Sequence, residues 1–144
     1  MTQVREAQAQ WRGNLEGGTG AISMGSGAFT GSYSKDTRFG DAAGTNPEEL
    51  VAAAQAGCYS MALAERMASA GYTPSVIDTT ARVYLNTEGD VPHISTIDIV
   101  ATAEVDDIKD DQFQQLAEAA KERCPVSNLC AGAQIRLEAG HTAS

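Results

Sequence analysis

The feature that most constrains the fold is a long segment almost free of charge, which opens with a strong helix-start signal. Asn46 is a favourable N-cap residue, Pro47 suits the first helical turn, and Glu49 stands where a capping-box acid belongs. From Leu50 to Ala64 the segment carries no charged residue, and a helix that is apolar nearly all round is a buried one. We expect a central buried helix that ends just before Gly71.

Strands are expected on both sides of this helix, because apolar and polar residues alternate there. Apolar residues at helical spacing predict a second long helix, and a proline predicts the start of a short one. The order of strands, helix, strands, helices and strand is typical of an α+β fold with antiparallel sheets around the central helix. No repeat or low-complexity linker interrupts residues 1–144, so a single domain is expected. The expected strands are 9–15, 19–24, 76–86, 94–105 and 133–139, the further helices are 110–123 and 125–131, and an irregular loop is expected over 33–46.

The charge balance and the lack of special segments exclude several classes of protein. Ten basic and 19 acidic residues give a net charge of −9, which argues against binding to nucleic acid or to an anionic membrane. No apolar run is long enough for a membrane span, and the first residues lack the apolar core of a signal peptide, so a cytoplasmic location is expected. No glycine-rich phosphate motif follows an expected strand, so no nucleotide or flavin cofactor is expected.

Three cysteines, Cys58, Cys124 and Cys130, are the candidates for chemistry. An odd number in a chain without an export signal is not a secreted disulfide framework. Cys58 lies in the middle of the apolar helix among alanines and Gly57, where it is either a buried packing thiol or a reactive one. Cys124 precedes Pro125, which places it at the N-cap of the short helix, where the helix dipole lowers a thiol pKa. A plain turn cysteine is the alternative there.

A zinc site is the metal-binding alternative for these residues. The three cysteines could be joined by His93 and His141, but five residues separate Cys124 from Cys130, outside the usual spacing of zinc ligands. We therefore expect no metal. For Cys130 we expect packing on the short helix, with a regulatory or alternative resolving role as the alternative. The sequence by itself does not pair any two of the thiols.

Two cysteine motifs carry a family resemblance that covers nearly the whole chain. The chain is similar to the osmotically inducible protein C (OsmC) family of peroxidases, and the place of Arg38 ahead of the Thr-Asn-Pro turn resembles the OsmC branch rather than the organic hydroperoxide resistance (Ohr) branch. The motifs that match are Thr37-Arg38-Phe39, Gly44-Thr45-Asn46-Pro47-Glu48-Glu49-Leu50, Ala56-Gly57-Cys58 and Cys124-Pro125-Val126-Ser127.

The resemblance implies a role for each motif residue in the reduction of organic hydroperoxides to alcohols. Cys58 would be the peroxidatic thiolate that becomes a sulfenic acid, and Cys124 the resolving thiol that forms a disulfide with it. Arg38 would stabilise the Cys58 thiolate and polarise the peroxide, while Glu48 would orient Arg38. The resemblance also implies an intertwined homodimer with interfacial active sites, an external dithiol reductant such as a lipoyl group, and a part in oxidative and osmotic stress defence.

The sequence around Cys58 independently indicates that its thiolate needs a nearby cation such as Arg38. A thiol in an apolar helix has a raised pKa, so a cation is needed, and Arg12, Lys35 and Arg38 are the only cations between Gln10 and Arg66. Glu48 precedes Cys58 by about 15 Å along a helix, so it must act through Arg38 or on the Cys58 of a partner chain. As an alternative, Glu48 is a first-turn acid that serves only the helix dipole.

A second function remains open at this level. An apolar cleft that admits an alkyl hydroperoxide would equally suit a carrier of lipid-like ligands that performs no chemistry.

Overall fold

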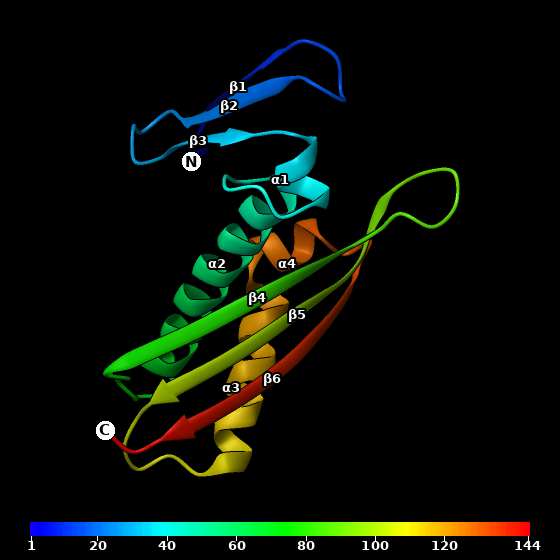
Figure 1. The fold of residues 1–144 in the computed structure, drawn as a ribbon. Coiled ribbons are helices and arrows are strands. Elements are labelled where there is room, and N and C mark those ends of the chain that lie inside the picture. The colour runs from blue at the N-terminus through cyan, green and yellow to red at the C-terminus, as the bar shows by residue number, and fades with distance from the viewer. The chain divides into compact units, whose positions relative to one another are not determined.

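The computed structural model describes residues 1–144, which divide into two compact units, Met1–Leu50 and Val51–Ser144 (Figure 1). The chain contains six strands and four helices, so the predicted α+β class is confirmed. The strands are β1 (Ala7–Arg12), β2 (Thr19–Met24), β3 (Thr30–Tyr33), β4 (Val76–Asn86), β5 (His93–Glu104) and β6 (Gln134–Thr142), and the helices are α1 (Lys35–Phe39), α2 (Pro47–Ser69), α3 (Asp110–Arg123) and α4 (Pro125–Leu129).

The first unit contains a three-stranded antiparallel sheet in the order β1-β2-β3. Gly20 on β2 is paired with Trp11 on one side and with Tyr33 on the other. A Cβ atom at Gly20 would collide with the Tyr33 ring, so the glycine leaves room for the two aromatic rings to approach. Their centroids lie 5.4 Å apart, which gives this sheet an aromatic contact across its middle strand.

The expectation of an irregular loop over residues 33–46 is wrong in part, because Lys35–Phe39 form the short helix α1. A reciprocal capping box starts this helix. The Ser34 hydroxyl accepts a hydrogen bond from the Thr37 N–H at 3.1 Å, and the Thr37 hydroxyl accepts one from the Ser34 N–H at 2.8 Å. Arg38 therefore stands on a helical turn that is fixed by its own caps.

Helix α2 has the predicted boundaries. Asn46 Oδ1 accepts a hydrogen bond from the Glu49 N–H at 2.8 Å, and Gly71, just beyond the helix, has a φ of 88° that favours glycine. The expectation that the helix is buried all round is wrong for the single chain, because the sheet and α3 cover only one side of it. Its buried stripe is Gln55, Tyr59, Leu63 and Met67. Its exposed stripe includes the apolar residues Ala53, Ala54, Gly57 and Met61, and continues to Glu65 and Ala68.

The second unit has a three-stranded sheet in the order β4-β5-β6. Strands β4 and β5 are antiparallel, but β5 and β6 are parallel, so the expectation of antiparallel sheets alone is wrong here. The reason is the crossover through α3 and α4, which returns the chain to the end of the sheet where β5 began.

The core of this unit lies between the sheet and its helices. Helices α2 and α3 lie on the same face of the sheet (Figure 1), and both contribute to one buried cluster with the central strand β5. The buried members from β5 are Ile97, Ile99, Ala101 and Ala103, and those from α3 are Phe113, Ala117 and Ala120. This packing buries one face of α2 against the sheet and α3.

Candidate active site

The predicted site residues form two groups, one in each compact unit. In the second unit, Cys58 lies on α2 and Cys124 is the N-cap residue of α4, as its place before Pro125 predicts. Both are free thiols, Cys58 half-buried and Cys124 buried. Each acts as a hydrogen-bond partner that shifts the pKa of the other, so the two sulfurs face each other. The packing thus brings together two thiols that the sequence alone could not pair.

The surroundings of the two sulfurs differ in their effect on ionisation. Burial raises the pKa of Cys58; the Val126 backbone opposes this, and the hydrogen bond with Cys124 adds to it. Burial also acts to raise the pKa of Cys124, but the side chain and backbone of Ser127, together with Cys58 and Val126, outweigh it and lower that pKa. Within this unit, Cys124 is therefore the better-stabilised thiolate of the two.

Two polar side chains beside Cys124 were given no role from the sequence: Gln55, and Ser127 of the second cysteine motif. The Gln55 amide nitrogen Nε2 donates to Ser127 Oγ at 2.9 Å and faces Cys124 Sγ at 3.5 Å. Gln55 and Ser127 are both buried. The sequence feature that could have pointed to Gln55 is its position: it is a polar residue four positions before Tyr59, on a helix stripe that is otherwise apolar.

The second group is Arg38 and Glu48, which form an ion pair within the first unit. Arg38 Nε lies 3.1 and 3.2 Å from the two Glu48 carboxylate oxygens, and Nη2 lies 2.5 Å from Oε1. The Glu48 side chain is only 13% exposed, against 37% for Arg38. Glu49 instead accepts a hydrogen bond from the Thr45 hydroxyl at 2.8 Å. Glu48 therefore holds the guanidinium, and the hydrogen bond between them raises the pKa of Arg38.

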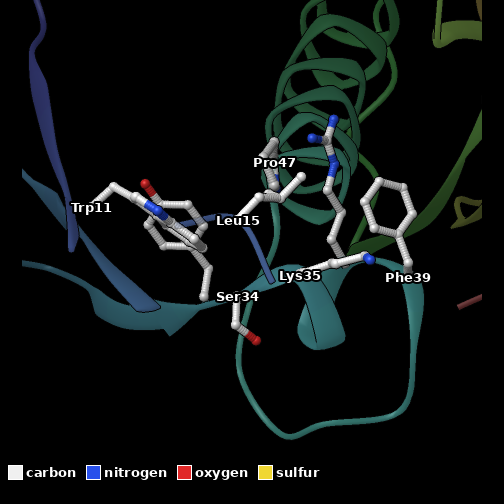
Figure 2. Close-up of a pocket in the computed structure, with 8 residues that line it drawn as sticks. Trp11, Leu15, Ser34, Lys35, Phe39 and Pro47 are labelled. Atoms are coloured by element: carbon white, nitrogen blue, oxygen red, sulfur yellow. The ribbon is translucent and has the colours of Figure 1, made fainter. Parts of the chain in front are cut away.

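A hollow of about 330 Å³ lies beside Arg38 in the same unit. Figure 2 shows Trp11 and Phe39 on opposite sides of this hollow, with Leu15 between them. The Arg38 guanidinium carbon lies 5.3 Å from the centre of the Phe39 ring. A cation bordered by apolar walls suits a ligand with one polar end and one apolar end. The lining residues are Trp11, Leu15, Tyr33, Ser34, Lys35, Arg38, Phe39 and Pro47.

The remaining candidates from the sequence do not join these groups. Cys130 is half-buried and packs against the hydrophobic core. Nowhere do three side chains of the His, Cys, Asp and Glu types gather closely enough to hold a metal ion, so the zinc alternative has no ligand set. None of the helices combines the length and hydropathy that crossing a membrane requires.

An α+β fold that sets two free thiols face to face defines a candidate cysteine-based redox enzyme. The family model for OsmC-like protein matches residues 40–139. Peroxiredoxin OsmC of Escherichia coli (strain K12) is 40% identical over 139 residues, which cover 96% of each chain, and the same figures hold for Peroxiredoxin OsmC of Shigella flexneri. The chain belongs to the OsmC family, and the predicted enzyme class, a peroxidase, is confirmed by these relatives.

Solved structures of more distant relatives share the fold. An organic hydroperoxide resistance protein from Elizabethkingia anophelis superposes with a TM-score of 0.74 at 22% identity, with all of each chain covered. The organic hydroperoxide resistance protein OhrB of Bacillus subtilis gives 0.69 at 24% identity, with 93% of this chain and 97% of that chain covered.

Proposed function

We propose that the protein reduces organic hydroperoxides to alcohols through a Cys58 sulfenic acid and a Cys58–Cys124 disulfide, and that an external dithiol recycles it. The observation that carries this proposal is the pair of free thiols that face each other, with polar groups arranged around Cys124. Two neighbouring free thiols can form a disulfide, and such a pair performs two-electron reduction without a cofactor.

In the first step, the Cys58 thiolate attacks the distal oxygen of the hydroperoxide. The S–O bond forms, the O–O bond breaks, and the alkoxide takes up a proton and leaves as the alcohol. Burial raises the pKa of Cys58, so this thiolate needs a positive charge that its own unit does not supply. In our proposal Arg38 supplies that charge and polarises the peroxide, and Glu48 fixes its orientation.

In the second step, Cys124 attacks the oxidised sulfur of Cys58 and the disulfide forms with loss of water. The lowered pKa of Cys124, due to Ser127 and its other hydrogen-bond partners despite burial, favours the thiolate that this step requires. An external dithiol then reduces the disulfide by thiol–disulfide exchange. We propose a lipoyl group as that dithiol, on the resemblance to the family.

The hollow beside Arg38 supports an organic rather than an inorganic peroxide. Its walls include the apolar side chains of Trp11, Leu15 and Phe39, which can cover an alkyl or aryl tail while the guanidinium binds the peroxide oxygens. Hydrogen peroxide has no tail to occupy this surface. Burial of an apolar tail contributes about 0.8 kcal/mol for each methylene group.

A second copy of the chain is the partner that we propose for the exposed stripe of α2. Ala53, Ala54, Gly57 and Met61 form an apolar face of small residues, and Met61 is 76% exposed in the single chain. Small side chains let another helix approach closely, and a two-fold dimer would bury the same face on both copies. Half-buried Cys58 is adjacent to Gly57, so such a dimer would also shield the thiol from water.

A peroxide-consumption assay tests the proposed reaction. The purified protein is given tert-butyl hydroperoxide or hydrogen peroxide, with dihydrolipoamide as the reductant. We expect faster turnover with the organic peroxide, and loss of turnover in Cys58→Ser while the circular dichroism spectrum stays unchanged. Turnover that survives in Cys58→Ser would refute the role of Cys58. A folded wild-type protein that consumes neither peroxide would favour the ligand-carrier alternative.

A further inference from the structure

Gln55 is a polar residue where the fold calls for an apolar one. It belongs to the buried stripe of α2, in line with Tyr59, Leu63 and Met67, and is fully buried. A buried carboxamide is unfavourable unless hydrogen bonds replace those that it made to water. The contacts of its two polar atoms therefore indicate what the residue does.

Those contacts are unequal. Both hydrogen bonds of Gln55 come from its nitrogen, to Ser127 Oγ at 2.9 Å and to Cys124 Sγ at 3.5 Å, whereas the buried oxygen Oε1 has no partner. The opposite orientation of the amide would leave its two N–H donors unpaired instead of one acceptor. A buried acceptor without a partner lowers stability, so the role of Gln55 is sought in the groups that receive its N–H bonds.

The amide and Ser127 form a short chain of donors that ends on the sulfur of Cys124. Because the Ser127 oxygen accepts a hydrogen bond from Gln55, its own hydrogen is free to turn toward Cys124. Bonds arranged head to tail in this way polarise one another. The Ser127 side chain indeed helps to lower the pKa of Cys124, although burial acts in the opposite direction. No charged group takes part: the backbone of Ser127 and Val126, the Cys58 side chain and the Ser127 hydroxyl act together there, and the Gln55 amide adds a contact to the same sulfur.

We propose that Gln55 is a positioning residue for the resolving step, holding Cys124 directly and through Ser127 as a thiolate aimed at Cys58. This inference rests on the proposed peroxidase cycle. In the step concerned, the Cys124 thiolate attacks the sulfur of the Cys58 sulfenic acid. The S–S bond forms, the S–O bond breaks, and hydroxide leaves and takes a proton from solvent. Cys124 is oxidised and the sulfenic sulfur of Cys58 is reduced.

The size of the effect follows from thiol chemistry. Loss of hydrogen bonds to a thiolate moves the midpoint of its ionisation upward by about 1–2 pH units. A less stabilised thiolate is a stronger nucleophile, which recovers a little under half of the loss on a logarithmic scale. At a pH below the ionisation midpoint of Cys124, the disulfide should then form about 3- to 13-fold more slowly in a variant without the Gln55 amide.

The test separates the two steps in a single turnover. Reduced full-length protein is mixed with one equivalent of tert-butyl hydroperoxide; dimedone trapping reports the sulfenic acid, and mass spectrometry of quenched samples reports the disulfide. In Gln55→Leu we expect sulfenic acid to form at the wild-type rate, disulfide to form about 3- to 13-fold more slowly at pH 7, and the pH midpoint of the disulfide step to rise. Gln55→Glu, which keeps the shape but replaces the donor by an anion, should slow the step further.

Ser60→Ala is the matched control for these variants. It removes a hydrogen bond of 2.7 Å from α2 to Thr79 on β4 and leaves the surroundings of Cys124 unchanged, so both steps should keep their wild-type rates. A disulfide step in Gln55→Leu with wild-type rate and midpoint would overturn the inference, and so would an equal slowing in the control.

A measurement without peroxide keeps this inference separable from the proposed function. In a Cys58→Ser, Cys130→Ser background, the pH dependence of iodoacetamide alkylation gives the ionisation of Cys124 alone. Replacement of Gln55 by Leu or Glu should raise its midpoint, and an unchanged midpoint in both would overturn the inference. Failure of the wild-type protein to form any sulfenic acid would instead refute the proposed peroxidase cycle.

Discussion

Replacing Gly57 by leucine gives opposite results for an isolated chain and for a dimer packed through α2. Gly57 lies inside the helix, and a Cβ atom built there meets no heavy atom within 4 Å. In a single chain the leucine would therefore point into solvent without a clash. If the exposed stripe of α2 is the interface with a second copy, the same side chain would be forced into the partner.

Gly57→Leu should stabilise an isolated chain but weaken a dimer, and the loss in the dimer should be larger than the gain in the monomer. Glycine is less favourable than leucine in a helix interior by about 1 kcal/mol, so an isolated chain gains that stability, and with an m-value of about 2 kcal/mol/M its urea midpoint rises by about 0.5 M. Overpacking costs about 1–3 kcal/mol at each site, and a two-fold interface contains the site twice. Dissociation should then become easier by about 2–6 kcal/mol, or roughly 30-fold to 10⁴-fold in Kd.

Sedimentation velocity and urea unfolding, each at several protein concentrations, distinguish these cases. We expect a wild-type dimer whose unfolding midpoint rises with concentration, and a Gly57→Leu protein that sediments as a monomer at the same concentrations. Gln115→Leu is the control, because it adds an equal apolar side chain to the exposed face of α3 and should leave the dimer intact. A Gly57→Leu protein that stays dimeric and unfolds at a higher urea concentration would refute the proposed interface.

Two further substitutions test the site and the core. Burial raises the pKa of Cys58, so loss of the positive charge in Arg38→Met should move the pH midpoint of sulfenic acid formation upward by about 1–3 pH units. The rate would then be lowest below that midpoint and recover as the pH rises; a slower rate with an unmoved midpoint would mean that Arg38 does not stabilise the thiolate. Tyr59→Phe removes a buried hydrogen bond of 2.9 Å to the Ala117 carbonyl and should lower the free energy of unfolding by about 1 kcal/mol, measured by urea denaturation. An unchanged value would show that this bond makes no net contribution.

Local signals predicted the helices well. Asn46 and Pro47 mark the start of α2, and the expected range 110–123 is that of α3, because caps, prolines and apolar spacing act over a few residues. Helix α1 was missed although its capping box is just as local, since its serine and threonine stand in a glycine-rich stretch that resembles a loop. The strands of the second unit were also placed closely, but not the direction of the last one, because direction depends on the crossover connection.

The sequence could predict which residues belong to the site, but it could not predict which of them contact one another. The sequence could show that Cys58 lies in an apolar helix and that Cys124 stands at a helix N-terminus, yet Gln55 looked like one more polar residue. Its partner Cys124 is 69 positions away along the chain, and no local rule reaches across that distance. The exposure of Gly57 was equally hidden, because an apolar helix suits burial by the same chain or by another.

By itself, the sequence determined the features that depend on neighbouring residues: where α2 and α3 begin and end, the place of Cys124 before Pro125, and the scarcity of cations near Arg38. The tertiary structure alone decided that Cys58 faces Cys124, that Gln55 donates to Cys124, and that only one side of α2 is covered. The physical reason is that burial and hydrogen-bond partners are set by packing between distant segments. The ionisation of each thiol depends on both.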